Sequence, residues 1–343
     1  MRALVARLDS AGDVLLAGPA VRAVAAGADD VTMLCGPRGR AAAELLPGVD
    51  RILCWPCPWI DATPPPVEQE AVDGLVAQLR ALRLDAAVIL TSFHQSALPL
   101  ALLLRLAGVR HIGALSEDYP GTLLDVRHRG LPDDLHEAQR ALSTARATGF
   151  ALPDGDDGRL RVRLDPELAP CDLPDDFVVV HPGASVPARA WSRERNAELV
   201  RVLAARGRQV VVTGGPDERE LCAVVAGPAR PEVLDLAGEL SLGALAAVLA
   251  RAACVVVGNT GPAHLAAAVG TPVVSLFAPT VPAARWRPFA VDHRLLHVPV
   301  PCAGCRAREC PVPGHPCLEG VTTAEVLAAV DTLSPVPDQE VLA

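Results

Sequence analysis

Residues 254–280 decide the fold of this chain, and they read CVVVGNTGPAHLAAAVGTPVVSLFAPT. The apolar run at each end has the length and composition of a buried strand, and the alanine-rich middle is typical of a helix. Residues 258–261 form a polar turn before the helix, and residues 270–272 (Gly-Thr-Pro) lead into the second strand. A strand, a helix and a second strand in this order form a parallel βαβ unit, so the stretch predicts a doubly wound α/β sheet.

The polar turn in this stretch also predicts a ligand. A turn that leaves the carboxyl end of a parallel strand and opens a helix directs several backbone N–H groups at one spot, and the partial charge of the helix adds to them. Thr260 and His264 follow in the turn and helix, and each can donate a hydrogen bond. We therefore expect a phosphate here, although an ordinary capped turn, with Pro262 in the first helical turn, is the structural alternative.

Composition limits the classes of function. A chain of 343 residues is long enough for two α/β domains, and its 50% hydrophobic content is that of a globular protein. A net charge of −9 argues against a nucleic-acid partner. No apolar run reaches the ~18 residues of a membrane span, and residues 1–9 read as a strand instead of a signal peptide. We expect a cytoplasmic, monomeric enzyme, with peripheral contact to a membrane surface left open.

The alternation of strands and helices divides the chain into two similar halves. Strands are predicted at 2–8, 30–35, 50–54, 85–91 and 111–113, with helices at 14–26, 41–46, 67–83, 96–107 and 135–149. Residues 117–134 and 151–176 look irregular, and the second half has strands at 177–180, 209–213, 232–235, 254–257 and 273–277. We place the domains at 1–165 and 166–343, with the C-terminal helix near 322–333 free to pack back on the first. The cleft between two such domains is the default ligand site.

The first polar motif, Arg7–Asp13, follows the first strand and precedes a helix. Gly12 permits a tight turn, and Asp13 then lies at the start of the helix. The simple interpretation is that Asp9 or Asp13 caps the helix, a role that aspartate often has. The functional alternative makes Asp13 a general base that takes a proton from an acceptor hydroxyl.

Two further motifs follow the first two strands of the second half. His181-Pro182-Gly183 begins one, and its Arg189 lies where a cation could reach a phosphate. The other contains Thr213-Gly214-Gly215 and Glu218, which could contact a ribose hydroxyl. The alternatives are a packed histidine, a solvated arginine and an acidic first helical turn that complements the helix dipole.

Four of the ten cysteines lie close together in a proline-rich segment: Cys302, Cys305, Cys310 and Cys317. Their spacing could hold a structural Zn²⁺, while free thiols or two disulfides are the alternatives, and a reducing compartment disfavours disulfides. Cys54 and Cys57 are a second Cys-x₂-Cys pair, to which we assign no role.

Five motifs together resemble a known family. The segments are 8–15 (LDSAGDVL), 181–184 (HPGA), 189–191 (RAW), 213–215 (TGG) and 258–268 (GNTGPAHLAAA), and residues 133–137 also match a family segment. The chain is similar over most of its length to glycosyltransferase family 9, the ADP-heptose:lipopolysaccharide heptosyltransferases. The resemblance implies a GT-B architecture, with an N-terminal acceptor-binding domain and a C-terminal domain that binds the nucleotide-sugar donor.

The resemblance also implies roles for single residues. Asp13 matches the family's proposed catalytic base, and Ser10 and Gly12 match the loop around it. The donor-binding set it implies, together with the strand-end residues above, is Ser10, Gly12, His181, Gly183, Arg189, Thr213, Gly214, Glu218, Asn259, Thr260, Gly261 and His264. Two positions depart from the family pattern: Arg189 replaces a usual lysine, and Asn259 replaces a frequent aspartate, which leaves the donor sugar open.

The resemblance implies an inverting transfer of a heptose-like sugar from an ADP-sugar to a glycan, lipid-linked or small-molecule acceptor. Arg189 and helix N-termini can stabilise the leaving diphosphate, and no Asp-x-Asp pair of metal type accompanies them, so we expect no metal cofactor in catalysis. The alternatives are a GT-B sugar-nucleotide epimerase or hydrolase, and a non-catalytic nucleotide-sugar-binding protein.

Overall fold

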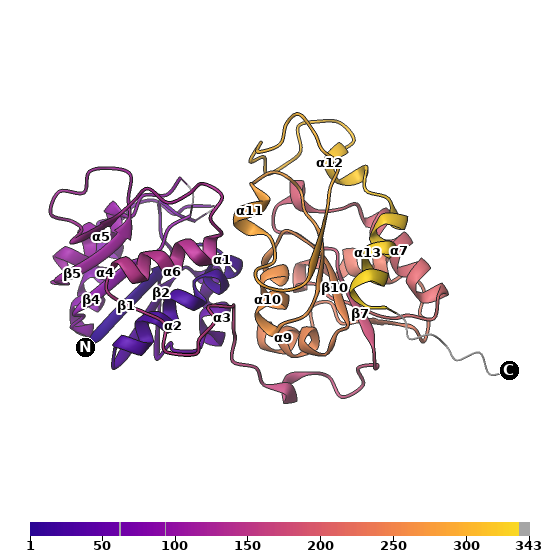
Figure 1. Ribbon diagram of the computed structural model, residues 1–343, viewed down its shortest axis with the longest axis horizontal. Helices are drawn as coiled ribbons and strands as arrows, with labels where there is room; N and C mark the ends of the chain where they lie inside the picture. Colours follow the sequence, from indigo (N-terminus) through magenta and orange to yellow (C-terminus); the bar gives the residue numbers. More distant parts are fainter. Residues whose placement is uncertain (62, 93, 336–343) are drawn as a thin grey trace. The chain divides into compact units, whose positions relative to one another are not determined.

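The computed structural model describes residues 1–61, 63–92 and 94–335 (Figure 1). The chain divides into two compact units, Met1–Arg163 and Leu164–Ala343. The segment that ends the first unit is fastened to it: Arg22 Nε lies 2.6 Å from Asp156 Oδ2, and the Arg163 N–H donates to the Leu45 carbonyl at 2.7 Å.

The first unit is a parallel six-stranded sheet in the order β3-β2-β1-β4-β5-β6. Its strands are β1 (Arg2–Arg7), β2 (Asp30–Cys35), β3 (Arg51–Cys54), β4 (Ala86–Ile89), β5 (His111–Leu115) and β6 (Val126–His128). Its helices are α1 (Ala11–Leu16), α2 (Gly18–Gly27), α3 (Arg40–Leu45), α4 (Gln69–Leu82), α5 (Leu98–Leu106) and α6 (Glu137–Ala147), with a 3₁₀ turn η1 at Pro37–Gly39.

Alternation along β1 explains how both faces of this sheet are covered. Leu4 and Ala6 belong to the core that α4 and α5 complete, whereas Ala3 and Val5 are buried on the other face, where α2 packs on β1 and β2. The order of the strands reverses between β1 and β4. In a doubly wound sheet, the loops at the carboxyl ends of such a strand pair form the ligand crevice.

The second unit repeats this plan with the order β12-β11-β10-β7-β8-β9, again parallel. Its strands are β7 (Phe177–His181), β8 (Gln209–Val212), β9 (Val233–Asp235), β10 (Cys254–Gly258), β11 (Val273–Leu276) and β12 (His293–Leu296). Its helices are α7 (Arg193–Ala205), α8 (Arg219–Ala226), α9 (Leu242–Arg251), α10 (Gly261–Val269), α11 (Ala283–Trp286), α12 (Pro316–Glu319) and α13 (Thr323–Leu333). The 3₁₀ turns are η2 (Pro166–Leu168), η3 (Pro187–Arg189) and η4 (Pro216–Glu218), and the strand order reverses between β7 and β10.

The α/β prediction is confirmed, but several details of it are wrong. Each sheet has an edge strand that the sequence did not reveal, β6 and β12. The single helix expected over 14–26 is two helices, because Pro19 starts a new first turn after Ala17. The C-terminal helix α13 packs against α7 and β11 of its own unit, where Val326 and Val330 enter the core.

Within the described part of the chain, none of the helices combines the length and apolar composition needed to cross a membrane.

Candidate functional site

Asp13 lies at the carboxyl end of β1, at the point where the strand order of the first sheet reverses. Arg7 ends β1 and α1 begins at Ala11, so Asp13 falls in the first turn of α1, next to the buried Gly12. Its Oδ1 accepts a hydrogen bond from Arg7 Nη2 at 3.0 Å, and its Oδ2 accepts one from the Ser10 hydroxyl at 2.7 Å. The Asp13 side chain keeps 20% of its surface exposed, so this fixed carboxylate can still meet a substrate.

Neither aspartate of the motif caps the helix in the way the simple interpretation suggests. The N-cap residue of α1 is Ser10, and its side chain makes no cap hydrogen bond. Asp9 lies deeper, with an Oδ2 that is 2.8 Å from Arg7 Nε and an Oδ1 that accepts a hydrogen bond from Gln95 Nε2. Burial raises the pKa of the Asp9 carboxyl, against the opposing effect of Arg7.

Ser92 and Gln95 belong to this site, although sequence reasoning missed them. Both follow β4, the strand that pairs with β1 across the reversal point. The Ser92 hydroxyl accepts a hydrogen bond from Arg7 Nη2 at 2.5 Å. Their position after the fourth predicted strand was the available signal, since that strand must lie beside the first in a doubly wound sheet.

A second group of predicted residues gathers at the carboxyl ends of β7 and β8. His181 Nδ1 lies 3.0 Å from the Thr213 hydroxyl, and its Nε2 lies 3.7 Å from Glu218 Oε2. Burial lowers the pKa of His181, so the ring favours its neutral form despite the nearby carboxylate. Glu218 Oε2 also accepts a hydrogen bond from the Gly215 N–H at 2.7 Å. This bond holds the carboxylate between the loops that follow β7 and β8.

The two glycines of this group are required by close packing. A Cβ at Gly183 would lie 1.9 Å from Glu218 Oε1, and a Cβ at Gly214 would lie 2.5 Å from Cys222 Sγ. The backbone of residues 181–183 therefore passes directly over the Glu218 side chain. This approach is open only to glycine at position 183 unless the carboxylate moves.

Arg189 and the turn after β10 lie against each other. A Cβ at Gly258 would be 2.6 Å from the Arg189 carbonyl oxygen, so η3 packs on the end of β10. Thr260 is the N-cap residue of α10, and its buried Oγ1 has no hydrogen-bond partner among the residues that the structure describes. Gly261 begins α10 and His264 is buried one turn later. The arrangement brings the backbone of the Arg189 turn, the Thr260 hydroxyl and the N-terminus of α10 together at the β7/β10 reversal point. A free hydroxyl and a helix N-terminus suit a phosphate.

Asn259 pairs with the backbone of Ala278 through both polar atoms of its side-chain amide. Its Nδ2 donates to the Ala278 carbonyl at 3.3 Å and its Oδ1 accepts from the Ala278 N–H at 3.1 Å. This reciprocal pair ties the loop after β10 to the end of β11. A carboxylate could accept from the N–H but could not donate to the carbonyl, so asparagine suits this contact where aspartate would not.

The predicted residues thus form two groups, one on each unit. The first unit carries Ser10, Gly12 and Asp13; the second carries His181, Gly183, Arg189, Thr213, Gly214, Glu218, Asn259, Thr260, Gly261 and His264. Within the second unit, the β7 loop connects the Thr213–Glu218 contacts with the Arg189–Gly258 contact.

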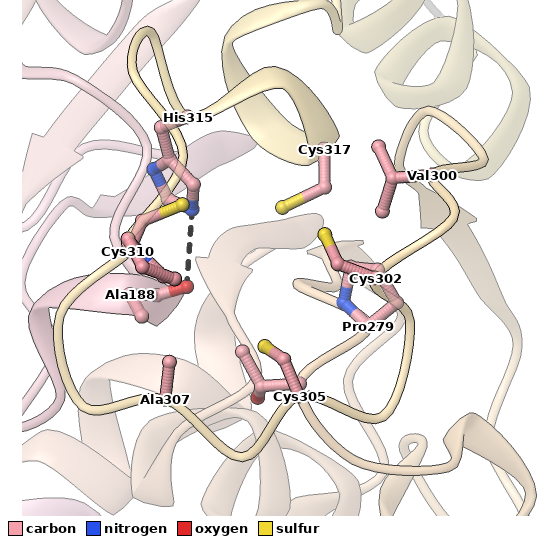
Figure 2. Close-up of a pocket in the computed structure, with 11 residues that line it drawn as sticks. Ala188, Pro279, Val300, Cys302, Cys305, Ala307, Cys310, His315 and Cys317 are labelled. Atoms are coloured by element: carbon pink, nitrogen blue, oxygen red, sulfur yellow. Dashed lines mark hydrogen bonds between the residues drawn. The ribbon is translucent and has the colours of Figure 1, made fainter.

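The four clustered cysteines line one small pocket in the second unit, together with Thr280 and His315 (Figure 2). The cysteine loop (residues 299–317) is joined to the Arg189 turn, because His315 Nε2 lies 3.2 Å from the Ala188 carbonyl. Burial and the neighbouring thiols raise the pKa of Cys317. Among the described residues, however, no group of three or more His, Cys, Asp or Glu side chains is arranged to hold a metal ion. The predicted zinc site stays a prediction.

Comparison with known proteins identifies the family of this chain. The family model described as glycosyltransferase family 9 (heptosyltransferase) matches residues 74–315. The chain belongs to glycosyltransferase family 9. The match covers both reversal-point loops of the second unit and the β4 loop of the first.

Individual relatives support the family and the fold. The chain is 31% identical over 204 residues to lipopolysaccharide heptosyltransferase 3 of Escherichia coli, a match that spans 56% of this chain and only 56% of that relative. A family 9 glycosyl transferase of Veillonella parvula DSM 2008 superimposes with a TM-score of 0.79 at 19% identity, covering 97% of this chain and 96% of that one. E. coli ADP-heptose lps heptosyltransferase II gives a TM-score of 0.74 at 20% identity, covering 97% and 98%. The fold of this chain is therefore that of solved family 9 proteins.

Proposed function

We propose that this protein transfers a heptose from ADP-heptose to a hydroxyl of a lipopolysaccharide-type acceptor, with inversion at the anomeric carbon. The observation that carries the proposal is the partly exposed Asp13 carboxylate, held by Arg7 and Ser10 at the reversal point of the first sheet. The donor and acceptor are taken from the names of the relatives, among them lipopolysaccharide heptosyltransferase 3 and an ADP-heptose enzyme. A nucleotide-sugar donor is consistent with a cytoplasmic reaction.

In the proposed reaction, Asp13 accepts the proton of the acceptor hydroxyl as that oxygen bonds to the anomeric carbon of the donor. The bond from this carbon to the diphosphate oxygen breaks, and ADP leaves with the electron pair. Because the incoming oxygen and the leaving diphosphate lie on opposite faces of the carbon, its configuration inverts. The protonated Asp13 then returns its proton to solvent, so the base is regenerated.

The second unit is proposed to hold the donor. Arg189, the Thr260 hydroxyl and the N–H groups at the start of α10 would stabilise the negative charge that develops on the leaving diphosphate. Glu218, fixed by the Gly215 N–H, is available to a ribose hydroxyl. The Asn259 contacts support a role in shaping this loop instead of binding the sugar. Since these groups can take up the leaving charge, we propose that transfer needs no metal ion.

The proposal is tested by incubating the purified protein with ADP-heptose in the presence and absence of a heptose-deficient lipopolysaccharide core. We expect ADP release that depends on the acceptor, and a product whose heptosyl linkage, examined by NMR, is inverted relative to the donor. EDTA should leave the rate unchanged. Equal ADP release without acceptor would contradict transfer and support hydrolysis, and a retained configuration would contradict direct displacement by the acceptor.

A further inference from the structure

Beneath Asp13 lies a buried cation that faces three carboxylates. Arg7 Nε is 2.8 Å from Asp9, and Arg7 Nη2 is 3.0 Å from Asp13 and 4.0 Å from Glu137. The side chains of Arg7, Asp9 and Glu137 expose 4%, 9% and 3% of their surface, against 20% for Asp13. Only Asp13 can therefore touch a substrate, and the other groups can affect the reaction only through it.

Ser92 links the two aspartates of this cluster. Its hydroxyl oxygen accepts from Arg7 Nη2 and lies 3.4 Å from both Asp9 Oδ2 and Asp13 Oδ1. A serine hydroxyl has one proton, so it can donate to only one of these carboxylates at a time. Asp9 is held from its other side by Gln95. Asp9 and Asp13 therefore share the positive charge of Arg7 through different nitrogens, and they compete only for the single proton of Ser92.

In the ion pairs between described residues, this cluster has more negative than positive groups. Arg140 Nε lies 3.6 Å from Glu137, so two guanidiniums face three carboxylates there. Burial has the largest effect on Asp9 and raises the pKa of its carboxyl. Arg7 lowers this pKa, and the negative charge of Asp13 raises it further. The more exposed Asp13 is the carboxylate that best tolerates the remaining negative charge, because water solvates it.

We propose that Arg7 is a positioning residue that keeps the Asp13 carboxylate charged and correctly oriented, and that Asp9 weakens this effect because its carboxylate shares the positive charge of Arg7. The inference rests on the proposed function, because it assumes that Asp13 is the base. It assigns to Asp9 the task of keeping the Asp13 carboxylate basic enough to accept a proton. An Asp13 that had Arg7 to itself would stay charged but would be a weaker base.

Other charged groups around α1 are engaged elsewhere. Arg22 of α2 is paired with Asp156, and Arg40 of α3 with Glu44. Arg38 of η1 lies 3.7 Å from Asp61. The charged groups within 4.0 Å of Arg7 in the described residues are thus the three carboxylates, Asp9, Asp13 and Glu137.

The test is the pH dependence of kcat for three variants, assayed with ADP-heptose and the heptose-deficient core. Arg7→Met should move the acidic limb of the profile up by about 1–3 pH units, because the cation that favours charged Asp13 is gone. It should also lower kcat by about 10²-fold, because the Asp13 carboxylate is no longer held in its orientation, while the donor KM stays within about twofold. Arg7→Lys should recover part of both effects.

Asp9→Asn should move the acidic limb in the opposite direction, to lower pH, because the carboxylate that shares the charge of Arg7 with Asp13 is gone. Its plateau rate should fall modestly, since the base is weaker. Ser92→Ala, which changes a loop residue, should move the acidic limb to higher pH, but by less than Arg7→Met does. Opposite shifts for Arg7 and Asp9 variants are a signature that mere loss of packing would not produce.

Arg51→Met is the matched control, because Arg51 pairs with Asp30 on the surface at the amino end of β3, 2.8 Å apart. It should leave the limb in place. If Arg7→Met does not fold, Asp9→Asn and Ser92→Ala decide the matter. Unshifted limbs in the folded variants would overturn the inference while an inactive Asp13→Asn still supports the proposed function. An active Asp13→Asn would instead overturn the proposed function itself.

Discussion

Replacing Asn259 by aspartate separates a structural role for this residue from a sugar-binding one. Asn259 is 5% exposed and pairs through its amide with both backbone groups of Ala278. In Asn259→Asp, the N–H that donates to the Ala278 carbonyl becomes an oxygen, and two acceptors then face each other across 3.3 Å. The variant keeps the size of the side chain, so the change tests the hydrogen bonds and the charge alone.

The expected cost follows from this geometry. A buried acceptor left without a donor costs about 1–3 kcal/mol, and a buried carboxylate adds desolvation, so we expect a loss of about 2–4 kcal/mol in unfolding free energy at pH 7. Burial should raise the pKa of the new carboxyl above the ordinary value of about 3.9 that it has when unfolded. The folded state then binds more protons than the unfolded state between these two values. The penalty relative to wild type therefore shrinks as the pH falls toward about 4, where the protonated acid can donate to Ala278.

Urea unfolding followed by far-ultraviolet circular dichroism at pH 7 and pH 4.5 measures both effects. Gln209→Glu, the same amide-to-acid change at the start of β8, is the control and should cost little at either pH. An Asn259→Asp protein within about 0.5 kcal/mol of wild type at pH 7 would refute the structural role, since that is the scatter of neutral substitutions. If that variant also lost donor affinity, Asn259 would be a sugar contact.

Three further predictions concern other parts of the chain. Gly258→Ala should raise the donor KM and destabilise the protein by about 1–3 kcal/mol, because its Cβ would meet the Arg189 carbonyl at 2.6 Å. An unchanged KM would show that this contact between the two loops does not affect donor binding. Hydrogen bonds from Arg22 lower the pKa of Asp156 to about 2. Asp156→Asn should therefore be less stable than wild type at neutral pH, and this difference should vanish as the pH falls from about 4 to 2. A difference in urea unfolding that does not depend on pH would contradict the pairing of Asp156 with Arg22. Elemental analysis of the purified protein tests the cysteine loop: about one equivalent of zinc supports the structural site, and less than about a tenth of an equivalent rejects it.

Long apolar strands and glycine-rich strand ends could be predicted from the sequence, whereas edge strands could not. The valine runs of β7, β8 and β10 are buried on both faces, so their pattern is continuous. The edge strands β6 (Val-Arg-His) and β12 (His-Arg-Leu-Leu) are partly exposed, and charged side chains there remove the apolar signal. They form because a neighbouring strand offers its backbone groups, which is tertiary information.

The residues of the candidate site could also be predicted only in part, because some of them come together only in the folded structure. Strand-end motifs located Asp13, His181 and Thr260, because helix starts and tight turns have recognisable residues. Ser92 and Gln95 have no such local pattern, and only the pairing of β4 with β1 brings them to Arg7. The contact of Asn259 with Ala278 could not be predicted either, because it joins a side chain to the backbone of a residue that is distant in the sequence.

The most direct test of the account is a pair of measurements on Asp13→Asn: acceptor-dependent ADP release from ADP-heptose, and the affinity for ADP by calorimetry. We expect transfer to fall by at least about 10²-fold, the usual contribution of a general base, with ADP affinity within a few fold of wild type. Near-normal transfer would contradict the assignment of Asp13 as the base, and a loss of ADP affinity with intact chemistry would place this carboxylate in the donor site instead.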